Sequence, residues 1–504
     1  MRKAKVLLIE PLEDKFFQGG DLPDNKLGLY ALEKLAGELE AHDISTKVVG
    51  MRDKTIEQMV EIAVRLDPIL IGFSALTLNF WLVKELAEKI KEKLPRVKIV
   101  LGGYHISTVP GDITKSAAFD YGVLGYGEAL LRKLAERLLE GCENVDDIAG
   151  LIIRDSFASG GFRKTEKAIL PAQKKFAWAK RNWVAIRKAR CNGLFYPAPV
   201  HQAGGVAQIS SGHGCIYNCS FCGTAAMEKT AYGNICGRER VAYRNADDVA
   251  AELKMLRSRG TRVGFLTTAT FNDSATRLEE LCEAIIKAGT HSELPEDHPD
   301  HIRNSIHLYA YVKVGLSKWQ AELMAKAGFT VLAVGVESAS FETVRGFNKP
   351  YSDFCQVIEH MQNWDSVGGI NRALFIFPTP ADDMRSKKEL IARLKQALPD
   401  CIRIAHLCPS FGTPEGDQMR AEGMVLSDDY NLYDHNHQLV KTPNFSVEEV
   451  EAARQEVYAK YYMSPEYREH VIEKLKRFPW LKESFSSFFA TLYRQKGIDL
   501  RGGF

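Results

Sequence analysis

The chain has 504 residues, 45% hydrophobic and 26% charged, which is enough for two to four domains with full apolar cores. Its 66 Lys and Arg against 64 Asp and Glu give a net charge of +2, which argues against binding of nucleic acid or a membrane surface by bulk electrostatics. The apolar run Val6–Ile9 is too short for a signal peptide or a membrane helix, so we expect a cytoplasmic protein.

Residues 1–145 alternate short apolar runs with helical patterns. This alternation predicts a parallel, doubly wound, flavodoxin-like sheet with right-handed crossovers. The expected strands are Val6–Glu10, Thr46–Val49, Ile69–Ser74, Lys98–Leu101 and Tyr121–Leu124, and the expected helices are Leu27–Glu40, Thr55–Leu66, Phe80–Lys93 and Glu128–Leu139.

Three loops rich in small residues follow strands of this predicted sheet. They are Ser74–Thr77, with Leu76, then Gly102–His105, with Gly103 and Tyr104, and Gly125–Glu128, with Tyr126 and Gly127. Each alone is compatible with a tight turn. Because ligands bind beyond the carboxyl ends of the strands in such sheets, three such loops on one edge favour a site for a large flat or phosphorylated ligand.

Residues 146–205 have the character of a connector. A strand-like run, Leu151–Arg154, precedes a turn-forming Ser/Gly cluster. Basic and aromatic residues then alternate, which predicts a solvated face over a domain junction, with nucleic-acid contact as the alternative. These residues are Lys174, Lys175, Phe176, Trp178, Lys180, Arg181, Trp183, Lys188 and Arg190.

Strands and helices alternate again from 206 to about 415. Six strands on one side of their crossovers predict an open, partial (β/α)6 relative of the (β/α)8 barrel, whose chemistry gathers at the carboxyl ends of its strands. The expected strands are Val206–Ser210, Val263–Thr267, Ser305–Val312, Val331–Val336, Arg372–Phe377 and Ile402–Leu407, and the expected helices are Ala246–Arg257, Leu278–Ala288, Ser317–Ala327, Phe354–Asp365 and Lys387–Leu398.

Cys215, Cys219 and Cys222 form a C-x3-C-x2-C array directly after the first of these strands. Three soft thiolates on one loop suit three irons of a cubane iron–sulfur cluster and leave the fourth iron open to another ligand. A structural zinc site is the alternative, but it usually needs a second pair of Cys or His. Ten cysteines in 504 residues indicate a reducing compartment rather than a disulfide framework.

Residues 416–504 are mainly helical and rich in aromatic residues, which a helical domain needs simply to pack. Tyr309 and Tyr311 alternate on a predicted barrel strand and therefore share one face. On an inward face they would approach the reacting groups, and core packing is the alternative. They are our candidate catalytic residues.

The array C-x3-C-x-aromatic-C, with Phe221 before the last cysteine, resembles the signature of radical S-adenosylmethionine (SAM) enzymes. Gly335–Ser338 is similar to the family's Gly-x-Glu-Ser, which implies that Glu337 and Ser338 contact SAM. Thr267 ends a strand where relatives carry a Gly-Gly-Glu type of sequence, and Phe377–Pro380 replaces Gly-x-Pro-Gly-Glu. Both departures loosen the expected placement of the amino and carboxylate groups of SAM.

The domain upstream of the array resembles the cobalamin-binding domain of cobalamin-dependent radical SAM enzymes, through Ile-Gly-Phe-Ser at 71–74, Leu-Gly-Gly-Tyr-His at 101–105 and Gly-Tyr-Gly-Glu at 125–128. The motif Asp-x-His-x-x-Gly, whose His ligates cobalt, does not follow Ile9. The resemblance therefore implies cobalamin bound without a His ligand, over a loop at 74–81. His105 is expected at a loop or the corrin edge rather than beneath cobalt.

The resemblance implies four segments: a cobalamin-binding domain at 1–145, a connector at 146–205, a radical SAM partial barrel at 206–415 and a helical C-terminal cap at 416–504. It implies a [4Fe-4S] cluster, SAM and cobalamin as cofactors, and an external low-potential electron donor of the flavodoxin or ferredoxin type. No nucleic-acid or membrane partner is expected.

We expect a C-methyltransferase that acts on an unactivated carbon of a small-molecule or secondary-metabolite precursor, using a 5′-deoxyadenosyl radical and methylcobalamin. The first alternative is a cyclase, ring-rearranging or oxidising enzyme with the same cofactors and no methyl transfer. An alternative of another class is a cobalamin or iron–sulfur redox sensor.

Overall fold

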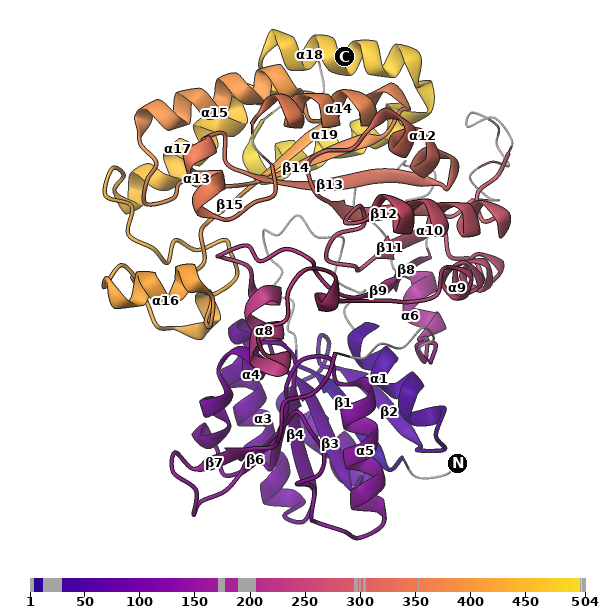
Figure 1. Ribbon diagram of the computed structural model, residues 1–504, viewed down its shortest axis with the longest axis vertical. Coiled ribbons are helices and arrows are strands. Elements are labelled where there is room, and N and C mark those ends of the chain that lie inside the picture. The colour runs from indigo at the N-terminus through magenta and orange to yellow at the C-terminus, as the bar shows by residue number, and fades with distance from the viewer. Residues whose placement is uncertain are drawn as a thin grey trace.

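The structure is a computed structural model that describes residues 4–11, 30–170, 177–188, 205–293, 298, 301, 305–351, 353–498 and 500. It contains two α/β units, each built on its own sheet, which follow one another along the long axis of the molecule (Figure 1). The predicted fold class is confirmed. No helix among the described residues is long and apolar enough to span a membrane.

The N-terminal unit contains a seven-stranded sheet, sheet A, in the order β2-β1-β3-β4-β5-β6-β7. The first five strands in sequence pair in parallel, as predicted, and β6 and β7 pair antiparallel at the edge. The last two lie within the predicted connector yet extend sheet A. The strands are β1 (Val6–Glu10), β2 (Thr46–Gly50), β3 (Leu70–Ser74), β4 (Lys98–Gly102), β5 (Tyr121–Val123), β6 (Leu151–Arg154) and β7 (Phe162–Lys164).

Helices cover both faces of sheet A. Leu7 and Ile9 belong to the core on one face, and Val6 and Leu8 belong to the core on the other, which explains why β1 is a continuous apolar run. Residues 27–29 of the predicted first helix lie outside the described residues. The helices are α1 (Tyr30–Glu40), α2 (Ile56–Leu66), α3 (Phe80–Lys93), α4 (Tyr104–Thr108) and α5 (Glu128–Leu139), with 3-10 turns η2 (Thr77–Asn79) and η3 (Pro110–Lys115).

The second unit contains a parallel six-stranded sheet, sheet B, in the order β15-β14-β13-β12-β11-β8. This is the predicted open barrel. Its strands are β8 (Val206–Ile209), β11 (Val263–Leu266), β12 (His307–Val312), β13 (Phe329–Glu337), β14 (Ile370–Ile376) and β15 (Cys401–Ala405).

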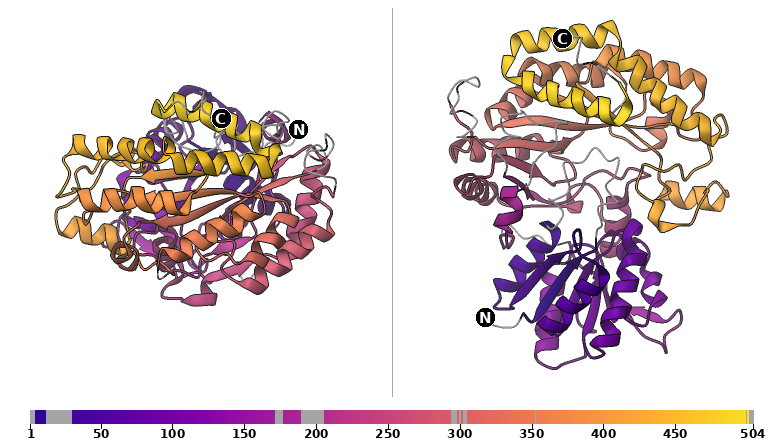
Figure 2. Two further views of the ribbon diagram at one scale, coloured as in Figure 1. Left: turned by 90° about the horizontal axis from the view of Figure 1, so that it is seen from above. Right: turned by 180° about the vertical axis from the view of Figure 1, so that it is seen from behind.

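Helices follow the strands of sheet B along the chain and pack on its outer side (Figure 2). A short two-stranded antiparallel sheet, β9 (Gly212–Gly214) with β10 (Val241–Tyr243), lies outside the main sheet, and β9 leads into the cysteine loop. The helices are α8 (Gly223–Tyr232), α9 (Ala246–Ser258), α10 (Ala275–Lys287), α12 (Lys318–Lys326), α13 (Phe341–Gly346), α14 (Cys355–Ser366) and α15 (Met384–Ala397), and the 3-10 turn η4 is Gly237–Arg240.

Helices α17, α18 and α19 lie on the side of sheet B remote from the N-terminal unit, whereas α16 lies at the level of α8 (Figure 1). The 3-10 turn η5 contacts the N-terminal unit, where the hydroxyl of Tyr430 donates a hydrogen bond to Asp112 at 3.0 Å. Two tyrosines of α17 cover the open edge of β15: the hydroxyl of Tyr458 accepts a hydrogen bond from Ile404 N–H and that of Tyr462 from Ile402 N–H, both at 2.8 Å. The elements are α16 (Pro414–Ala421), η5 (Tyr430–Leu432), α17 (Val447–Tyr462), α18 (Pro465–Arg477), η6 (Pro479–Leu481) and α19 (Lys482–Lys496).

Helix α18 is anchored at the amino ends of the last two barrel strands. The ammonium group of Lys474 lies 2.6 Å from a carboxylate oxygen of Asp400 and 3.0 Å from one of Asp365. Together with the edge contacts of α17, this attaches the C-terminal helices to the outside of the barrel. Helices α17, α18 and α19 therefore do not cover the carboxyl ends of its strands. Met419 and Val440, in the part of the predicted cap before α17, pack there with Ile376 and Leu407.

The connector reaches the barrel through helix α6 (Trp183–Lys188). Arg181, which we expected on a solvated face, is only 3% exposed at its side chain and lies 2.6 Å from Glu252 of α9. Its guanidinium carbon also lies 4.7 Å from the ring centroid of Tyr30 in α1. A buried cation therefore joins the two units here. Lys174, Lys175, Phe176 and Arg190 lie outside the described residues.

Candidate functional site

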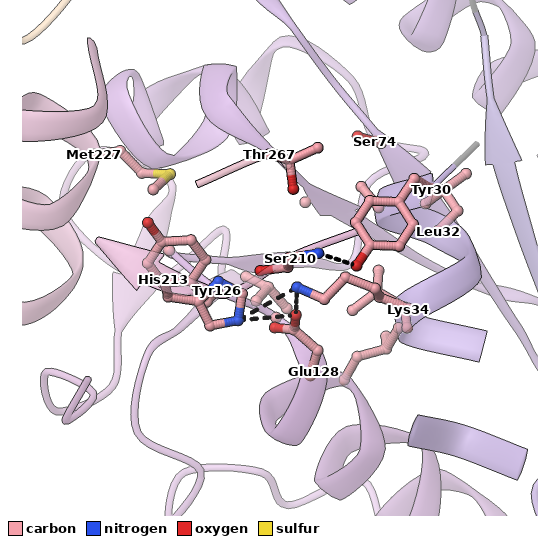
Figure 3. A pocket seen from close by; sticks show the side chains of 18 of the residues that line it. Tyr30, Leu32, Lys34, Ser74, Tyr126, Glu128, Ser210, His213, Met227 and Thr267 are labelled. Atoms are coloured by element: carbon pink, nitrogen blue, oxygen red, sulfur yellow. Dashed lines mark hydrogen bonds and ion pairs between the residues drawn. The ribbon is translucent and has the colours of Figure 1, made fainter. Parts of the chain in front are cut away.

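A cavity of about 510 Å³ lies between the two units, where the carboxyl ends of both sheets face each other (Figure 3). Its N-terminal wall contains seven of the residues predicted to bind a cofactor: Ser74, Gly102, Gly103, Gly125, Tyr126, Gly127 and Glu128. The opposite wall contains Gln208, Ser210, Gly212, His213, Gly214 and Thr267, all close in sequence to the ends of β8, β9 and β11.

Two glycines in the N-terminal wall have positive φ angles and leave no room for a side chain. At Gly103, with φ of +93°, a Cβ would lie 2.8 Å from the carbonyl oxygen of Ala75, and at Gly125, with φ of +77°, one would lie 2.5 Å from the hydroxyl of Tyr232. Glycine is required at both positions by conformation and by contact. The backbone itself therefore forms this part of the wall, as the sequence indicated.

Of the predicted cofactor-binding residues in the N-terminal unit, four lie outside the cavity lining. His105 is fully buried, with Nδ1 3.2 Å from the hydroxyl of Thr77 and Nε2 3.1 Å from a carboxylate oxygen of Asp112. Burial lowers the pKa of His105. Thr77 begins a 3-10 turn rather than a loop, and Leu76 is 37% exposed. Only 74–76 of the predicted 74–81 loop is therefore non-helical.

Tyr104, the fourth, contacts the cysteine loop instead. A Cβ on Gly223, the residue after Cys222, would lie 2.2 Å from the hydroxyl oxygen of Tyr104. Burial raises the pKa of this phenol, so its hydroxyl remains protonated. The loop after β4 thus lines the cavity with its glycines and reaches the second unit with its tyrosine.

A buried charge cluster, Lys34–Glu128–His213, crosses the cavity wall between the two units (Figure 3). Oε1 of Glu128 lies 2.6 Å from Nζ of Lys34 and 3.1 Å from Nε2 of His213. Burial alone would raise the pKa of Glu128, but Lys34 and His213 together hold it well below its usual range. Glu128 was predicted, whereas Lys34 carries no sequence signal beyond its place on a helix.

Tyr126 connects the same wall to the cysteine loop. Its ring stacks on His213 with a centroid distance of 4.0 Å, and its hydroxyl accepts a hydrogen bond from Gly214 N–H at 2.8 Å. The hydroxyl also donates to Glu228 at 3.2 Å. Arg240 donates to Glu228 at 2.9 Å and to the carbonyl oxygen of Tyr217, inside the cysteine loop, at 2.8 Å.

The three cysteines of the array are half-buried on one loop and suit a cluster better than a single ion. Sγ of Cys215 lies 3.7 Å from the hydroxyl of Thr270. The sulfur atoms of these three cysteines do not all lie within 4.8 Å of one another. A tetrahedral zinc ion with Zn–S bonds of about 2.3 Å would need sulfurs about 3.8 Å apart. In this structure the three sulfurs are therefore too far apart to bind one zinc ion together.

Burial raises the pKa of Cys219 to about 12, and it also raises that of Cys215. Thiols with such pKa values are neutral at physiological pH unless a metal binds them and displaces the proton.

Phe221 packs edge-on against Phe347 at a centroid distance of 4.9 Å. The aromatic residue of the motif therefore fastens the loop to the segment after α13 and lies outside the cavity lining.

Glu337 ends β13 with φ of +64° at a register shift in the sheet. Its Oε1 lies 2.8 Å from Nζ of Lys349, and both side chains are 12% exposed. Burial alone would lower the pKa of Lys349, but Glu337 and Cys219 raise it, so the amine carries a charge. The hydroxyl of Ser338 accepts a hydrogen bond from Ser340 N–H at 3.1 Å. The sequence did not indicate Lys349 as a site residue, because only the ion pair with Glu337 in the folded chain brings it there.

Tyr309 and Tyr311 share one face of sheet B. Register aligns Tyr309 with Phe265 and Gln208, and Gln208 lines the cavity. Tyr309 is 1% exposed, stacks on Phe265 at 4.3 Å and accepts a hydrogen bond from Arg372 at 3.1 Å. Its buried hydroxyl is already engaged, which favours the packing interpretation for Tyr309, while Tyr311 is half-buried.

Two family models match the chain. The B12 binding domain matches residues 28–135 and the radical SAM superfamily matches residues 209–394. Their order is that of the two units, and the cavity lies between them. The chain belongs to the cobalamin-dependent radical SAM enzymes, and its cofactors are a [4Fe-4S] cluster, SAM and cobalamin.

Among curated relatives, the tryptophan 2-C-methyltransferase of Streptomyces laurentii is 23% identical over 60% of this chain, and the chain spans about half of that relative, 55% of its length. An uncharacterized methyltransferase of Pyrococcus horikoshii is 22% identical, covering 92% of this chain and 94% of the relative. The anaerobic magnesium-protoporphyrin IX monomethyl ester cyclase of Synechocystis is 24% identical, covering 86% and 81%.

The solved structure of the radical SAM methyltransferase TsrM from Kitasatospora setae, with cobalamin and a [4Fe-4S] cluster bound, is similar in fold. Its TM-score is 0.68 at 18% sequence identity, over 92% of this chain and 89% of that chain. The likeness extends over both units of the present structure.

Proposed function

We propose that this enzyme is a C-methyltransferase that acts on a carbon of a small-molecule or secondary-metabolite precursor. The observation that carries the proposal is the cavity between the carboxyl edges of the two sheets. Loops of the cobalamin-binding unit form one wall, and Gly212–Gly214, directly before Cys215, form part of the other. A methyl donor held by the first wall would lie beside the cluster loop.

Two relatives support this reading by their names, the tryptophan methyltransferase and the methyltransferase of Pyrococcus horikoshii. The TsrM enzyme has also been solved with its tryptophan substrate and a SAM analogue, at a TM-score of 0.64 and 20% identity over 84% of this chain. We therefore take amino acids with aromatic side chains as the first substrates to test.

When bound, the cluster and SAM supply one-electron cleavage to a 5′-deoxyadenosyl radical, and cobalamin supplies a transferable methyl group. The residues of the chain hold and shield these groups. Cys215, Cys219 and Cys222 supply three ligands to the cluster, and Glu337 offers a carboxylate on the barrel side. The closely fitted loops at Gly103 and Gly125 hold the corrin side and exclude water. We propose an external low-potential electron donor.

The proposal is tested by anaerobic turnover with methyl-deuterated SAM, cobalamin and a low-potential reductant, first with tryptophan and then with a cell extract. Mass spectrometry should detect a product that carries a trideuteromethyl group, together with S-adenosylhomocysteine and 5′-deoxyadenosine. The matched control is Cys222→Ala, which should lose the product and the 5′-deoxyadenosine together.

The similarity to the magnesium-protoporphyrin cyclase favours a second candidate, ring closure or oxidation without methyl transfer. In that case 5′-deoxyadenosine forms, and the product carries no deuterium from the methyl group of SAM. A protein with a full cluster that yields neither nucleoside would contradict both candidates and favour a sensor.

A further inference from the structure

The segment Phe347–Lys349, directly after α13, is docked on the cysteine loop through its backbone and two of its side chains. Ser220 N–H donates to the carbonyl oxygen of Phe347 at 3.1 Å, and the side-chain amide of Asn348 donates to the carbonyl oxygen of Asn218 at 2.9 Å. The rings of Phe221 and Phe347 pack at 4.9 Å. The position of Lys349 is therefore tied to the loop that carries Cys219 and Cys222.

Lys349 extends from this segment into a buried space over the backbone of β13. A Cβ on Gly335 would lie 3.0 Å from Nζ of Lys349 and 2.5 Å from Oε1 of Glu337, so both charged groups rest directly on Gly335. The same ammonium group interacts electrostatically with Cys219 and Cys222. One buried cation thus pairs with the carboxylate of Glu337 and also interacts electrostatically with two cysteines of the array.

We propose that Lys349 is a positioning residue that holds the carboxylate of Glu337 in place and raises the reduction potential of the cluster. Reduction adds one electron to a cluster whose three thiolates already make the site negative. A buried cation stabilises the added charge more than a solvated one does, because the surrounding dielectric is lower. Glu337 has the opposite effect, since its carboxylate partly neutralises the ammonium group.

The two partners therefore predict shifts of opposite sign. In Lys349→Met the positive charge is lost at similar side-chain length, and the midpoint potential should become more negative. In Glu337→Gln the ammonium group loses its counter-ion, and the potential should become more positive. Lys349→Arg keeps the charge and is the matched control, with a potential close to that of the unaltered enzyme.

The experiment is an anaerobic redox titration of the reconstituted holoenzyme without substrate, followed by electron paramagnetic resonance of the reduced cluster. Dithionite or a titanium(III) chelate donates the single electron that each cluster gains, and no bond forms or breaks. Iron and sulfide contents establish that each variant carries a full cluster. Equilibrium dialysis of the same loaded variants then gives the dissociation constant for SAM, which should rise in Lys349→Met and stay near the original value in Lys349→Arg.

Unchanged potentials in fully loaded Lys349→Met and Glu337→Gln would overturn the proposal. Shifts of the same sign in both would also overturn it, because they would indicate a general change in solvent access. If Lys349→Met does not assemble a cluster, Glu337→Gln still decides, since it must shift the potential to more positive values. None of these readings depends on methyl transfer, so failure of the proposed function would leave them intact.

Discussion

At the residue scale, Glu128 illustrates how one carboxylate can belong to two domains. It begins α5 of the cobalamin-binding unit, and it contacts Lys34 of the same unit and His213 of the barrel. Its side chain is 12% exposed, so both pairings are largely shielded from water. Removal of one member of such a group leaves the others without compensation for their lost hydration.

We predict that Glu128→Gln destabilises the apo protein by about 3 kcal/mol, near the lower end of the cost of breaking a buried ion pair. Thermal unfolding at pH 7 measures this, with Glu136→Gln as the control, since Glu136 lies on the same helix with its side chain 38% exposed. Equal unfolding temperatures for the two variants would contradict the expected role of Glu128.

The same carboxylate gives a pH dependence. Because the folded-state pKa of Glu128 lies well below 4.5, its contribution to stability is fully present above about pH 4.5 and is lost as pH falls towards the folded-state value. The difference in the free energy of unfolding between the original protein and Glu128→Gln should therefore shrink as the pH falls from about 5 to about 3, where Glu128 in the unfolded chain takes up a proton. A constant difference over that range would argue against it.

At the element scale, the edge of sheet B is closed by side chains rather than by another strand. Tyr458 and Tyr462 lie one helical turn apart on α17 and accept hydrogen bonds from alternate N–H groups of β15. Both tyrosines are at least 95% buried, so these N–H groups have no ready replacement by water. The edge would otherwise present unpaired donors.

We predict that Tyr458→Phe and Tyr462→Phe each cost about 1–3 kcal/mol, the penalty for a buried donor left unsatisfied. Hydrogen exchange should accelerate at the amides of Ile404 and Ile402, respectively, while β12 in the centre of the sheet stays protected. Tyr493→Phe, at a side chain that is 43% exposed, is the control. Unaltered exchange at Ile402 and Ile404 would show that the hydroxyls do not satisfy these amides.

At the scale of the whole molecule, the cavity between the two units exists only while these units stay together. Arg181 of the connector contributes to that contact, because it lies against Tyr30 of the first unit and Glu252 of the second. Its neighbour Lys180 makes an ion pair with Glu40 at the surface, with a side chain that is 43% exposed. The two adjacent cations therefore differ mainly in burial.

We predict that Arg181→Met loosens the junction and lowers stability by about 1–3 kcal/mol, because Glu252 loses one of two buried partners and keeps Arg244 at 2.5 Å. Lys180→Met should cost less than about 1 kcal/mol, as surface pairs do. Limited proteolysis of the apo protein and retention of hydroxocobalamin on a desalting column provide the two readouts. The same cleavage rate and cobalamin retention in both variants would mean that Arg181 has no special role in the junction.

Much of the fold could be predicted from local sequence patterns. The apolar runs of β1 and β3 indicate strands buried on both faces, and the period of α2 or α10 indicates a helix that packs on a sheet. Cys215, Cys219 and Cys222 are recognisable as a set of metal ligands because all three come from a single loop, so their spacing alone predicts that their sulfurs converge. The glycines at 103 and 125 are likewise recognisable because they follow predicted parallel strands.

What the sequence determined by itself is therefore local: the alternation of strands and helices, the cysteine loop and the edge of each sheet that carries the site. Only the tertiary structure decided that Lys34 and His213 meet on Glu128, that Lys349 rests with Glu337 on Gly335, and that α17, α18 and α19 pack outside the barrel. The physical reason is that periodicity reports which face of an element is buried. It does not report which charged side chain, up to 179 residues away, completes a buried pair.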